Sequence, residues 1–323
     1  MTAVNTHART VSPYPGLPAG PHGRVLFPPA KVNLFLDVLG KRADGYHDIA
    51  TLLVPVNLYD TLELQPNGDG ELKLECHPDT IPTGPGNLVW KAAEALRRAF
   101  GVTAGATMRL TKRIPHEAGL GGGSSDAAAA IAGLNAVWGL NRSVDELLPV
   151  AAEVGSDVPG FLAVSHEPTA SAGLGAWCTG RGEVVSPVPA GPPIHLVIVK
   201  PPVGCPTAEV YKRYRKADSP ADSRRVIDAF ARGDVEELAA GLHNALQPAA
   251  FDLQPLVRKV YDRLTNCRPL GVLLSGSGAS VFAVGRSAAD AAAVADRFVR
   301  LTGPDPELAA CRVFVARTLG AMT

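Results

Sequence analysis

The sequence predicts an α+β protein, and three observations support this class. With 323 residues, 46% of them hydrophobic and 19% charged, the chain can bury one large core or two ordinary ones. Alternating apolar residues at 30–39 and a continuous apolar run at 195–200 are typical of strands, whereas residues 88–100 have the apolar spacing of a helix. A mainly helical set over 207–265 is followed by two apolar strands within 271–284, which is the composition of an α+β domain.

Two domains are expected, and the proline-rich segment 187–193 is the predicted boundary between them. The N-terminal domain would span residues 24–190 and the C-terminal domain residues 191–323. Residues 1–23 contain four prolines but no apolar core of a secretory signal, so we expect a disordered extension. A transit peptide is the minor alternative, because this segment contains Arg9 and no acidic residue.

Charge and cysteine content exclude several classes of protein. The formal net charge is zero and the pI is about 7.1, so neither nucleic acid nor an anionic membrane is an expected partner. The five cysteines are scattered and lack C-x-x-C spacing, which fits a reducing, cytoplasmic compartment. No apolar run approaches the length of a membrane span. We expect a monomer or a weak homodimer.

In the N-terminal half, helices carry local signals at their ends. Asn87 is a plausible cap for a helix over 88–100 and Gly101 is its stop, while Ser143 caps a helix over 144–153. The expected strands are 24–27, 30–39, 49–56, 107–112, a hairpin of 60–64 with 71–75, and a second hairpin within 173–185.

The C-terminal half starts with the strand 195–200 and continues with helices. The expected helices begin at 207 and then span 222–230, 235–246, 253–265 and 288–300. The remaining strands are two within 271–284, joined by a glycine-serine turn, and one at 311–316.

A glycine loop that leads into a helix is the most informative stretch of the chain. Its glycines are Gly119, Gly121, Gly122 and Gly123. Without a Cβ, the backbone can turn tightly and bring its N–H groups close to a ligand. We expect Ser124, Ser125 and Asp126 to cap the alanine-rich helix that follows, whose positive dipole end attracts phosphate.

The alternative for this loop is a flexible linker, but linkers do not usually lead straight into a strong helix. The loop also lacks the Lys-Ser or Lys-Thr pair of a Walker A sequence and the G-x-G-x-x-G spacing of dinucleotide loops. A phosphate loop of another family is therefore required.

Two pairs of residues have two open interpretations each. Lys31 and Asn33 fall on the same side of a strand, either at a functional site or as ordinary edge residues. Tyr46 and His47 follow an Asp-Gly turn. Either their rings clasp a planar base, or Tyr46 packs against the protein and His47 faces solvent.

Asp157 and the second glycine turn are also ambiguous from the residues alone. Asp157 precedes a Val-Pro pair and has few polar neighbours in the sequence. It is either an N-cap or a buried general base that needs a nearby cation. Gly276, Ser277 and Gly278 form either a simple hairpin tip or a loop that closes over a phosphate near the first glycine loop.

Four segments together resemble the GHMP superfamily of small-molecule kinases and occur in the family's order. They are 29–34 (Pro-Ala-Lys-Val-Asn-Leu), 115–125, 155–159 (Gly-Ser-Asp-Val-Pro) and 274–280 (Leu-Ser-Gly-Ser-Gly-Ala-Ser). The segments 41–47 (Lys-Arg-Ala-Asp-Gly-Tyr-His) and 119–128 are similar to members that phosphorylate a cytidyl alcohol. The resemblance implies a ribosomal-protein-S5-like N-terminal domain, a ferredoxin-like α/β C-terminal domain, and an active site in the cleft between them.

The resemblance also implies roles for individual residues, with ATP and Mg²⁺ as cofactors. Asp157 would be the general base for the substrate hydroxyl, and Lys31 beside it would keep the carboxylate ionised and stabilise charge on the γ-phosphoryl group. The implied ATP-binding residues are Asn87, Lys112, Pro115, Gly119, Leu120, Gly121, Gly122, Gly123, Ser124 and Ser125. The implied substrate-binding residues are Asn33, Tyr46, His47, Thr207, Tyr211, Gly276, Ser277 and Gly278.

Two positions depart from the family pattern. Gly160 stands where a bulky apolar residue often follows the Asp-Val-Pro segment, and Leu53 stands where an aromatic residue is often found, so substrate affinity is the property they affect. The protein ligands of Mg²⁺ stay open. The rival hypotheses are a GHMP kinase for another alcohol such as homoserine or mevalonate, a non-catalytic ATP-binding regulator, and an RNA-binding module.

Overall fold

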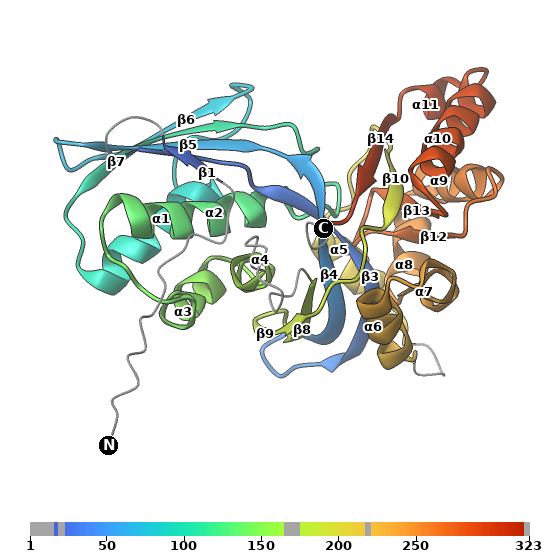
Figure 1. Ribbon diagram of the computed structural model, residues 1–323, viewed down its shortest axis with the longest axis horizontal. Coiled ribbons are helices and arrows are strands. Elements are labelled where there is room, and N and C mark those ends of the chain that lie inside the picture. The colour runs from blue at the N-terminus through green and yellow to red at the C-terminus, as the bar shows by residue number, and fades with distance from the viewer. Residues whose placement is uncertain (1–15, 19–22, 165–174, 217–220, 320–323) are drawn as a thin grey trace. The chain divides into compact units, whose positions relative to one another are not determined.

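The computed structural model describes residues 16–18, 23–164, 175–216 and 221–319 (Figure 1). The chain forms two compact units, each assembled from segments far apart in the sequence. The first unit comprises Met1–Pro28, Thr61–Lys112 and Gly123–Glu167, and the second comprises Pro29–Asp60, Arg113–Gly122 and Pro168–Thr323.

The first unit contains a five-stranded sheet in the order β1-β2-β5-β7-β6. Its strands are β1 (Gly16–Pro18), β2 (Arg24–Leu26), β5 (Thr61–Asn67), β6 (Leu72–His77) and β7 (Gly105–Thr111). The hairpin predicted for 60–64 and 71–75 is wrong, because β7 lies between β5 and β6. It pairs antiparallel with β5 and parallel with β6.

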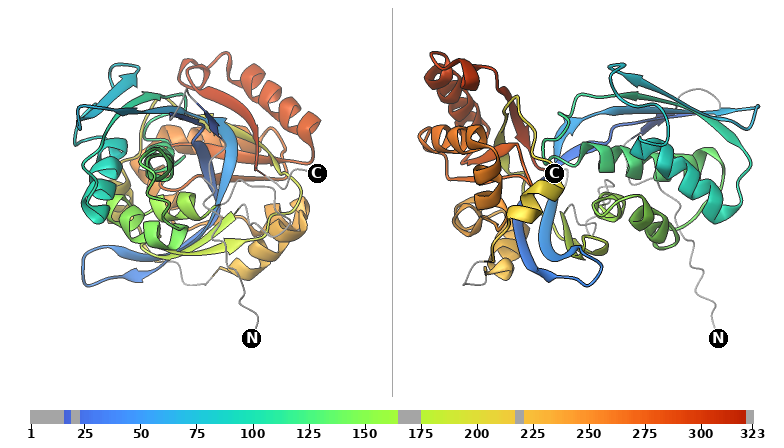
Figure 2. Two further views of the ribbon diagram at one scale, coloured as in Figure 1. Left: turned by 60° about the vertical axis from the view of Figure 1, so that its left-hand side comes forward. Right: turned by 180° about the vertical axis from the view of Figure 1, so that it is seen from behind.

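The helices of this unit lie on one side of this sheet (Figure 1 and Figure 2). They are α1 (Leu88–Phe100), α2 (Gly122–Val137), α3 (Val144–Val154) and α4 (Val158–Ala163). Asn87 caps α1 by accepting a hydrogen bond from the N–H of Val89, and Gly101 ends it at φ 65°, so both predicted helix signals are confirmed. Ser143 and Glu146 form a capping box at α3.

Helix α2 lies unusually close to the sheet. A Cβ at Gly133 would lie 2.3 Å from Leu64 and 2.5 Å from Leu26, so a larger residue would force these leucines to move. The alanines from Ala127 to Ala130 are fully buried for the same reason, since small side chains let the helix backbone approach the strands.

The second unit contains two sheets that share a core. The five-stranded sheet has the order β11-β3-β4-β8-β9 and the four-stranded sheet the order β12-β13-β10-β14. The strands are β3 (Pro29–Lys41), β4 (His47–Tyr59), β8 (Gly175–Gly180), β9 (Val184–Val188), β10 (His195–Lys200), β11 (His243–Asn244), β12 (Gly271–Leu274), β13 (Val281–Gly285) and β14 (Arg312–Arg317).

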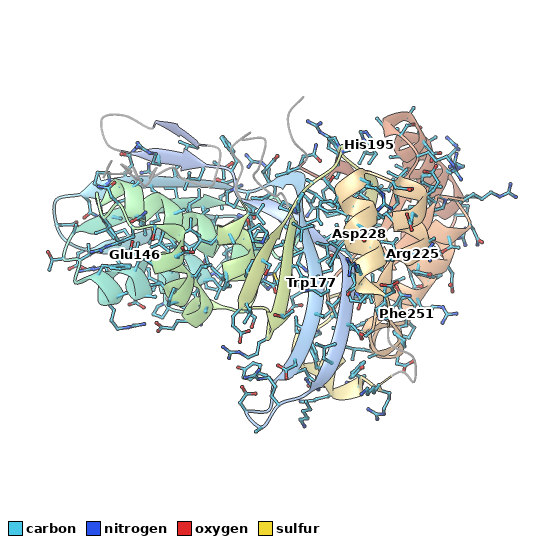
Figure 3. The ribbon with its side chains drawn as sticks, turned by 60° about the horizontal axis from the view of Figure 1, so that its bottom comes forward. Glu146, Trp177, His195, Arg225, Asp228 and Phe251 are labelled. Carbon is cyan, nitrogen blue, oxygen red and sulfur yellow. The ribbon has the colours of Figure 1, made fainter. Side chains whose placement is uncertain are left out.

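Strand β10 shows how the two layers form. Leu196 and Ile198 point into the cluster shared with β3 and β4, whereas Val197 and Val199 point into the cluster shared with α9 and α10. In the first cluster, Trp177 of β8, labelled in Figure 3, packs near Phe35 with ring centroids 5.9 Å apart.

The helices of the second unit lie in its C-terminal part. They are α5 (Thr207–Arg213), α6 (Ser223–Arg232), α7 (Val235–Gly241), α8 (Gln247–Leu253), α9 (Pro255–Thr265), α10 (Ala288–Thr302) and α11 (Pro306–Ala309). The single helix predicted over 235–246 is wrong. The chain leaves the helix at Gly241, and His243 and Asn244 pair with β3 as β11.

The observed elements confirm the α+β class. The division by contacts differs from the expected boundary near residue 190, because the segments on both sides of it belong to the second unit. The domain ranges 24–190 and 191–323 stay a prediction. No helix within the described ranges is long and apolar enough to cross a membrane.

Candidate active site

In the second unit, the first glycine loop is held between strand β3 and the turn that joins β12 to β13. The backbone N–H of Lys31 donates to the carbonyl of Leu120 over 2.9 Å. The Ser275 hydroxyl donates to the carbonyl of Gly119, also over 2.9 Å. Gly119 has φ 70°, and a Cβ there would lie 2.0 Å from the Ser275 carbonyl oxygen. A glycine is therefore required where the two loops meet.

The helix after the loop begins earlier than predicted, at Gly122. Ser124, Ser125 and Asp126 therefore lie inside the helix, so their prediction as caps is wrong. The glycines supply the first N–H groups of α2, and the first four N–H groups of any α-helix lack an intrahelical acceptor. Such a start is suited to an anion, because the backbone donors and the helix dipole act together.

In the first unit, Asn87 and Lys112 lie near one another at the carboxyl ends of the parallel strands β6 and β7. The Asn87 amide donates to the carbonyl of Pro82 over 2.8 Å and to the Cys76 sulfur over 3.6 Å. The backbone N–H of Lys112 donates to the carbonyl of His77. Ligands commonly bind beyond the carboxyl ends of parallel strands, where helix N-termini converge.

Lys112 is also paired with a carboxylate. Its Nζ lies 2.6 Å from Oδ2 of Asp126, with side-chain exposures of 12% for the lysine and 2% for the aspartate. This pair connects the end of β7 with α2. Burial raises the pKa of the nearby Cys76 thiol, and the charge of Asp126 raises it further.

Lys31 and Asn33, which the sequence places on one side of a strand, are in contact in β3. The Lys31 ammonium donates to Oδ1 of Asn33 over 2.5 Å, and both residues are buried. The Asn33 amide donates in turn to the hydroxyl of Thr51 on β4. A Cβ at Gly276 would lie 3.0 Å from the Lys31 ammonium. The predicted residues Lys31, Asn33, Leu120 and Gly276 thus gather at one place in the second unit.

The β12–β13 turn is fixed by two side chains that no sequence motif indicates. The Asn244 amide donates to the carbonyls of Leu274 and Gly276, each over 2.8 Å. Oε1 of Gln247 accepts from the N–H of Leu274. At the tip of the turn, the hydroxyls of Thr207 and Ser277 lie 3.0 Å apart.

A second group of predicted residues forms an aromatic cluster in the same unit. The rings of His47 and Tyr211 are stacked, with centroids 5.0 Å apart and an interplanar angle of 27°. Tyr214 meets His47 edge-on at 6.3 Å. Tyr46 is 56% exposed, and the Arg181 guanidinium lies 5.1 Å from its ring centroid.

Asp157 belongs to the first unit, whereas Lys31 belongs to the second, so their predicted pairing stays a prediction. Asp157 occupies the N-cap position of α4, but its side chain makes no capping hydrogen bond. The N-cap interpretation therefore does not account for its carboxylate. Gly160 and Pro159 are buried within the same short helix.

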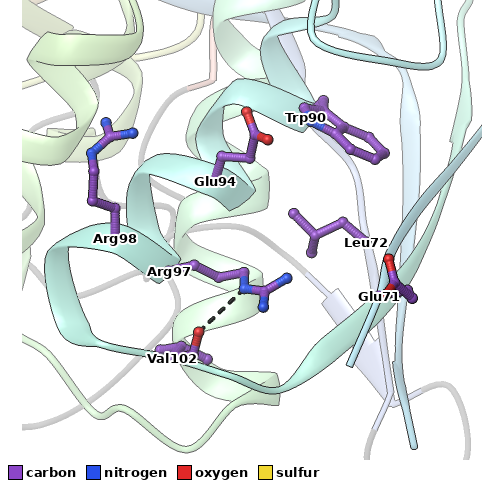
Figure 4. A pocket seen from close by; sticks show the side chains of 7 residues that line it. All are labelled: Glu71, Leu72, Trp90, Glu94, Arg97, Arg98 and Val102. Carbon is purple, nitrogen blue, oxygen red and sulfur yellow. Dashed lines mark hydrogen bonds between the residues drawn. The ribbon is translucent and has the colours of Figure 1, made fainter. Parts of the chain in front are cut away.

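A hollow of about 550 Å³ lies elsewhere on the first unit, between α1 and the start of β6 (Figure 4). It is lined by Glu71, Leu72, Trp90, Glu94, Arg97, Arg98 and Val102, a set that includes none of the predicted site residues. Arg97 already donates to the carbonyl of Val102 there. The hollow therefore shares no lining residue with the site that the two glycine loops form.

Comparison with known proteins agrees with this arrangement. A family model described as the GHMP kinases N terminal domain matches residues 87–164, and one described as GHMP kinases C terminal matches residues 226–305. A 4-diphosphocytidyl-2-C-methyl-D-erythritol kinase of Pelotomaculum thermopropionicum is 41% identical over 290 residues, which cover 89% of this chain and 97% of the relative. A protein of the same name from Brevibacillus brevis is 40% identical over 258 residues, covering 79% and 85%.

Two solved structures extend the comparison to the fold. The crystal structure of a 4-(cytidine 5'-diphospho)-2C-methyl-D-erythritol kinase superposes with a TM-score of 0.71 at 32% identity and covers 91% of this chain and 98% of its own. A homoserine kinase from Cytophaga hutchinsonii gives 0.74 at 19% identity, covering 94% and 98%, and at that identity it supports the fold alone.

The fold and the family matches define an ATP-dependent small-molecule kinase of the GHMP type. Within that class, the chain belongs to the 4-diphosphocytidyl-2-C-methyl-D-erythritol kinase family. The α+β class, the GHMP resemblance and the kinase activity predicted from the sequence are therefore confirmed.

Proposed function

We propose that this kinase transfers the γ-phosphoryl group of ATP to the 2-hydroxyl of 4-diphosphocytidyl-2-C-methyl-D-erythritol, in the non-mevalonate route to isoprenoids. The observation that carries the proposal is the meeting of Lys31, the glycine loop and the Gly276 turn at one place. The substrate rests on the relative that is 41% identical and bears this name.

The nucleotide would bind to the glycine loop and the start of α2. The N–H groups of Gly122, Gly123, Ser124 and Ser125 would hold its phosphates. Asn87 and Lys112 would border the adenine, although in the free chain both already have hydrogen-bond partners of their own. The remaining residues predicted to contact ATP are Pro115, Gly119, Leu120 and Gly121.

When bound with the nucleotide, Mg²⁺ would supply positive charge that offsets the negative charge of the transferred phosphoryl group. Mg²⁺ is commonly held by one or two carboxylates together with substrate phosphates and water, so a dedicated protein cage is unnecessary. The described ranges contain no group of three or more His, Cys, Asp or Glu side chains arranged to hold a metal ion. This fits an ion that arrives with the nucleotide.

For the chemical step, Asp157 would accept the proton of the attacking hydroxyl, and Lys31 would stabilise charge on the transferred group. The carboxylate of Asp157 makes no capping bond to α4, which leaves it available for this role. Lys31 is 3% exposed, so its charge would act in a poorly solvated place, where electrostatic interactions are stronger.

The cytidyl group would bind at the aromatic cluster of His47 and Tyr211, with Tyr46 beside it. The two stacked rings are 5.0 Å apart. Inserting a planar base between them would require them to separate. Asn33, Thr207 and the turn 276–278 would face the diphosphate end of the substrate.

A panel of alcohols tests the substrate directly. Purified protein with ATP and Mg²⁺ would be incubated with the cytidyl alcohol, homoserine, mevalonate and galactose, and ADP release would be measured. We expect release only with the cytidyl alcohol. Equal release with homoserine or mevalonate would support the rival kinases, and no release with ATP still bound would support a regulatory role.

Asp157→Asn tests the proposed general base in the same assay. Turnover should fall by a factor on the order of 10² to 10⁴, the usual contribution of a general base, while ATP binding persists. A variant with unchanged turnover would remove Asp157 from the proposed role. The cytoplasmic location, the absence of nucleic-acid and membrane partners, and the monomer or weak homodimer remain predictions from the sequence.

A further inference from the structure

Thr51 is the one polar side chain in the run 49–56 of strand β4, where every neighbour is apolar. It is 3% exposed, and its hydroxyl makes two hydrogen bonds. The hydroxyl donates to the backbone carbonyl of Phe35 over 2.7 Å. It also accepts from Nδ2 of Asn33 over 2.8 Å. Thr51 therefore connects the backbone of β3 to the side chain that contacts Lys31.

The direction of these bonds is determined by chemistry. A backbone carbonyl only accepts hydrogen bonds, so the single proton of the Thr51 hydroxyl must go to Phe35. The hydroxyl can then only accept from Asn33, which must present its NH₂ group. The opposite end of that amide, Oδ1, consequently faces the Lys31 ammonium, which is a pure donor.

The inverted amide has no such partners. It would place the Asn33 NH₂ group against an ammonium and its oxygen against a hydroxyl whose proton is already used. The first contact would oppose two donors and the second would oppose two acceptors. Both lie in a buried place, where an unsatisfied polar group costs about 1–3 kcal/mol. The chain from Phe35 through Thr51 and Asn33 to Lys31 thus has one stable orientation.

A local irregularity of the sheet lies beside this connection. The pairing of β3 with β4 shifts register between Asn33 and Phe35, which disrupts the ladder there. The Gly276 turn lies beside both groups, since a Cβ at Gly276 would crowd the Lys31 ammonium at 3.0 Å and Oδ1 of Asn33 at 3.3 Å. The turn therefore limits the space into which the ammonium can move.

We propose that Thr51 is a positioning residue for Lys31. It fixes the Asn33 amide so that a carbonyl oxygen orients the ammonium, without Thr51 itself touching a substrate. The proposal rests on the proposed function, in which Lys31 stabilises the transferred phosphoryl group. Because orientation of a catalytic group affects the rate of the chemical step, kcat should respond more than either Michaelis constant.

Two variants separate the hydroxyl from the shape of the side chain. Thr51→Val keeps the volume and removes the hydrogen bonds, whereas Thr51→Ser keeps the hydroxyl. We expect kcat to fall on the order of tenfold in Thr51→Val, the size of one or two buried hydrogen bonds, with both Michaelis constants within about twofold. Thr51→Ser should retain kcat within about twofold.

A double-mutant cycle tests whether the effect passes through Lys31. In a Lys31→Ala background, Thr51→Val should change the residual kcat by less than about twofold. The proposal is overturned if Thr51→Val has the kcat of the wild type. It is also overturned if Thr51→Val lowers kcat equally with and without Lys31, which would indicate a general structural effect.

A second measurement does not depend on the substrate being correct. Labelling of Lys31 by trinitrobenzenesulfonate, followed by mass spectrometry, reports how firmly its amine is held. The labelling rate should rise severalfold in Thr51→Val but not in Thr51→Ser, at temperatures where both are folded. Unchanged labelling would overturn the proposal, whereas a failure of the proposed function would appear in the alcohol panel with the unmodified protein.

Discussion

The ammonium of Lys112 lies 2.6 Å from a carboxylate oxygen of Asp126, and the two charges are almost fully removed from solvent. Lys112 follows β7 and Asp126 lies in α2, so this pair connects the strand before the glycine loop with the helix after it. A buried pair of this kind is strongly destabilised when one partner is lost, because the other charge stays behind.

The Lys112–Asp126 pair leads to a prediction on stability and nucleotide binding. Asp126→Leu should lower the free energy of unfolding by about 3–5 kcal/mol, whereas Lys112→Met combined with Asp126→Leu should recover most of it. Chemical denaturation monitored by circular dichroism measures both. If Lys112 also contacts ATP, the double variant should bind ATP more weakly although it is stable. Wild-type ATP affinity in that variant would remove Lys112 from the nucleotide site.

The stacked rings of His47 and Tyr211 give a prediction on the second substrate. His47→Ala should raise the Michaelis constant for the cytidyl alcohol by about tenfold, because stacking on one base is worth about 1–3 kcal/mol. The Michaelis constant for ATP should change by less than about twofold if the two sites are separate. His195→Ala, at the start of β10, is the matched control and should leave both constants unaltered. Equal increases for both substrates in His47→Ala would place His47 elsewhere.

The buried thiol of Cys205 gives a prediction on pH. Burial raises the pKa of this thiol to about 11. Its pKa in the folded state is then above the value of about 8.5 in an unfolded chain, so the protonated thiol favours folding. That contribution is complete below about pH 8.5 and is lost as the pH rises toward 11.

The unfolding free energy should therefore fall more steeply between pH 9 and 11 in the wild type than in Cys205→Ala. Lys200 acts in the opposite direction, because burial lowers its pKa. Because both proteins contain Lys200, the difference between their unfolding free energies gives the contribution of the thiol alone. Parallel curves for the two proteins would show that Cys205 does not titrate differently on folding.

Local sequence signals predicted the elements whose ends depend on adjacent residues. Asn87 and Gly101 bound α1 because a cap and a left-handed glycine act within one turn. Strand β10 was predicted by its apolar run alone, since it is buried on both faces.

The errors arose where a distant segment decides the structure. Segments 60–64 and 71–75 have the pattern of a hairpin, yet β7 pairs with both of them. Asn244 falls in a region of helical spacing, but its side chain bonds the carbonyls of Leu274 and Gly276, thirty or more residues away. No short-range pattern contains such a contact.

The residues of the candidate site also divide into those that a sequence motif predicts and those that depend on contacts between distant segments. The family resemblance identified Lys31, Asn33 and the two glycine loops, and the structure brings their members in the second unit together. Thr51 and Asn244 were missed because their importance lies in the hydrogen bonds they make to those residues. A polar residue inside an apolar strand was the available signal for Thr51.

Gly276 provides the last prediction, because it combines a strained conformation with a crowded position. Its φ is 57°, and a Cβ there would lie 3.0 Å from the Lys31 ammonium and 3.2 Å from the carbonyl oxygen of Gly119. Gly276→Ala should lower kcat at least about tenfold, since the methyl group would displace Lys31 or the glycine loop, and a residue with a Cβ pays about 1–2 kcal/mol for this backbone conformation.

The matched control for Gly276→Ala is Gly40→Ala, in the same strand as Lys31, where a Cβ would meet nothing within 4 Å. It should leave kcat unchanged. Steady-state kinetics at saturating ATP, with thermal melting of both variants, distinguish a displaced Lys31 from simple loss of folding. A folded Gly276→Ala variant with wild-type kcat would mean that the turn does not confine the ammonium, and the reaction centre would then have to be placed away from this contact.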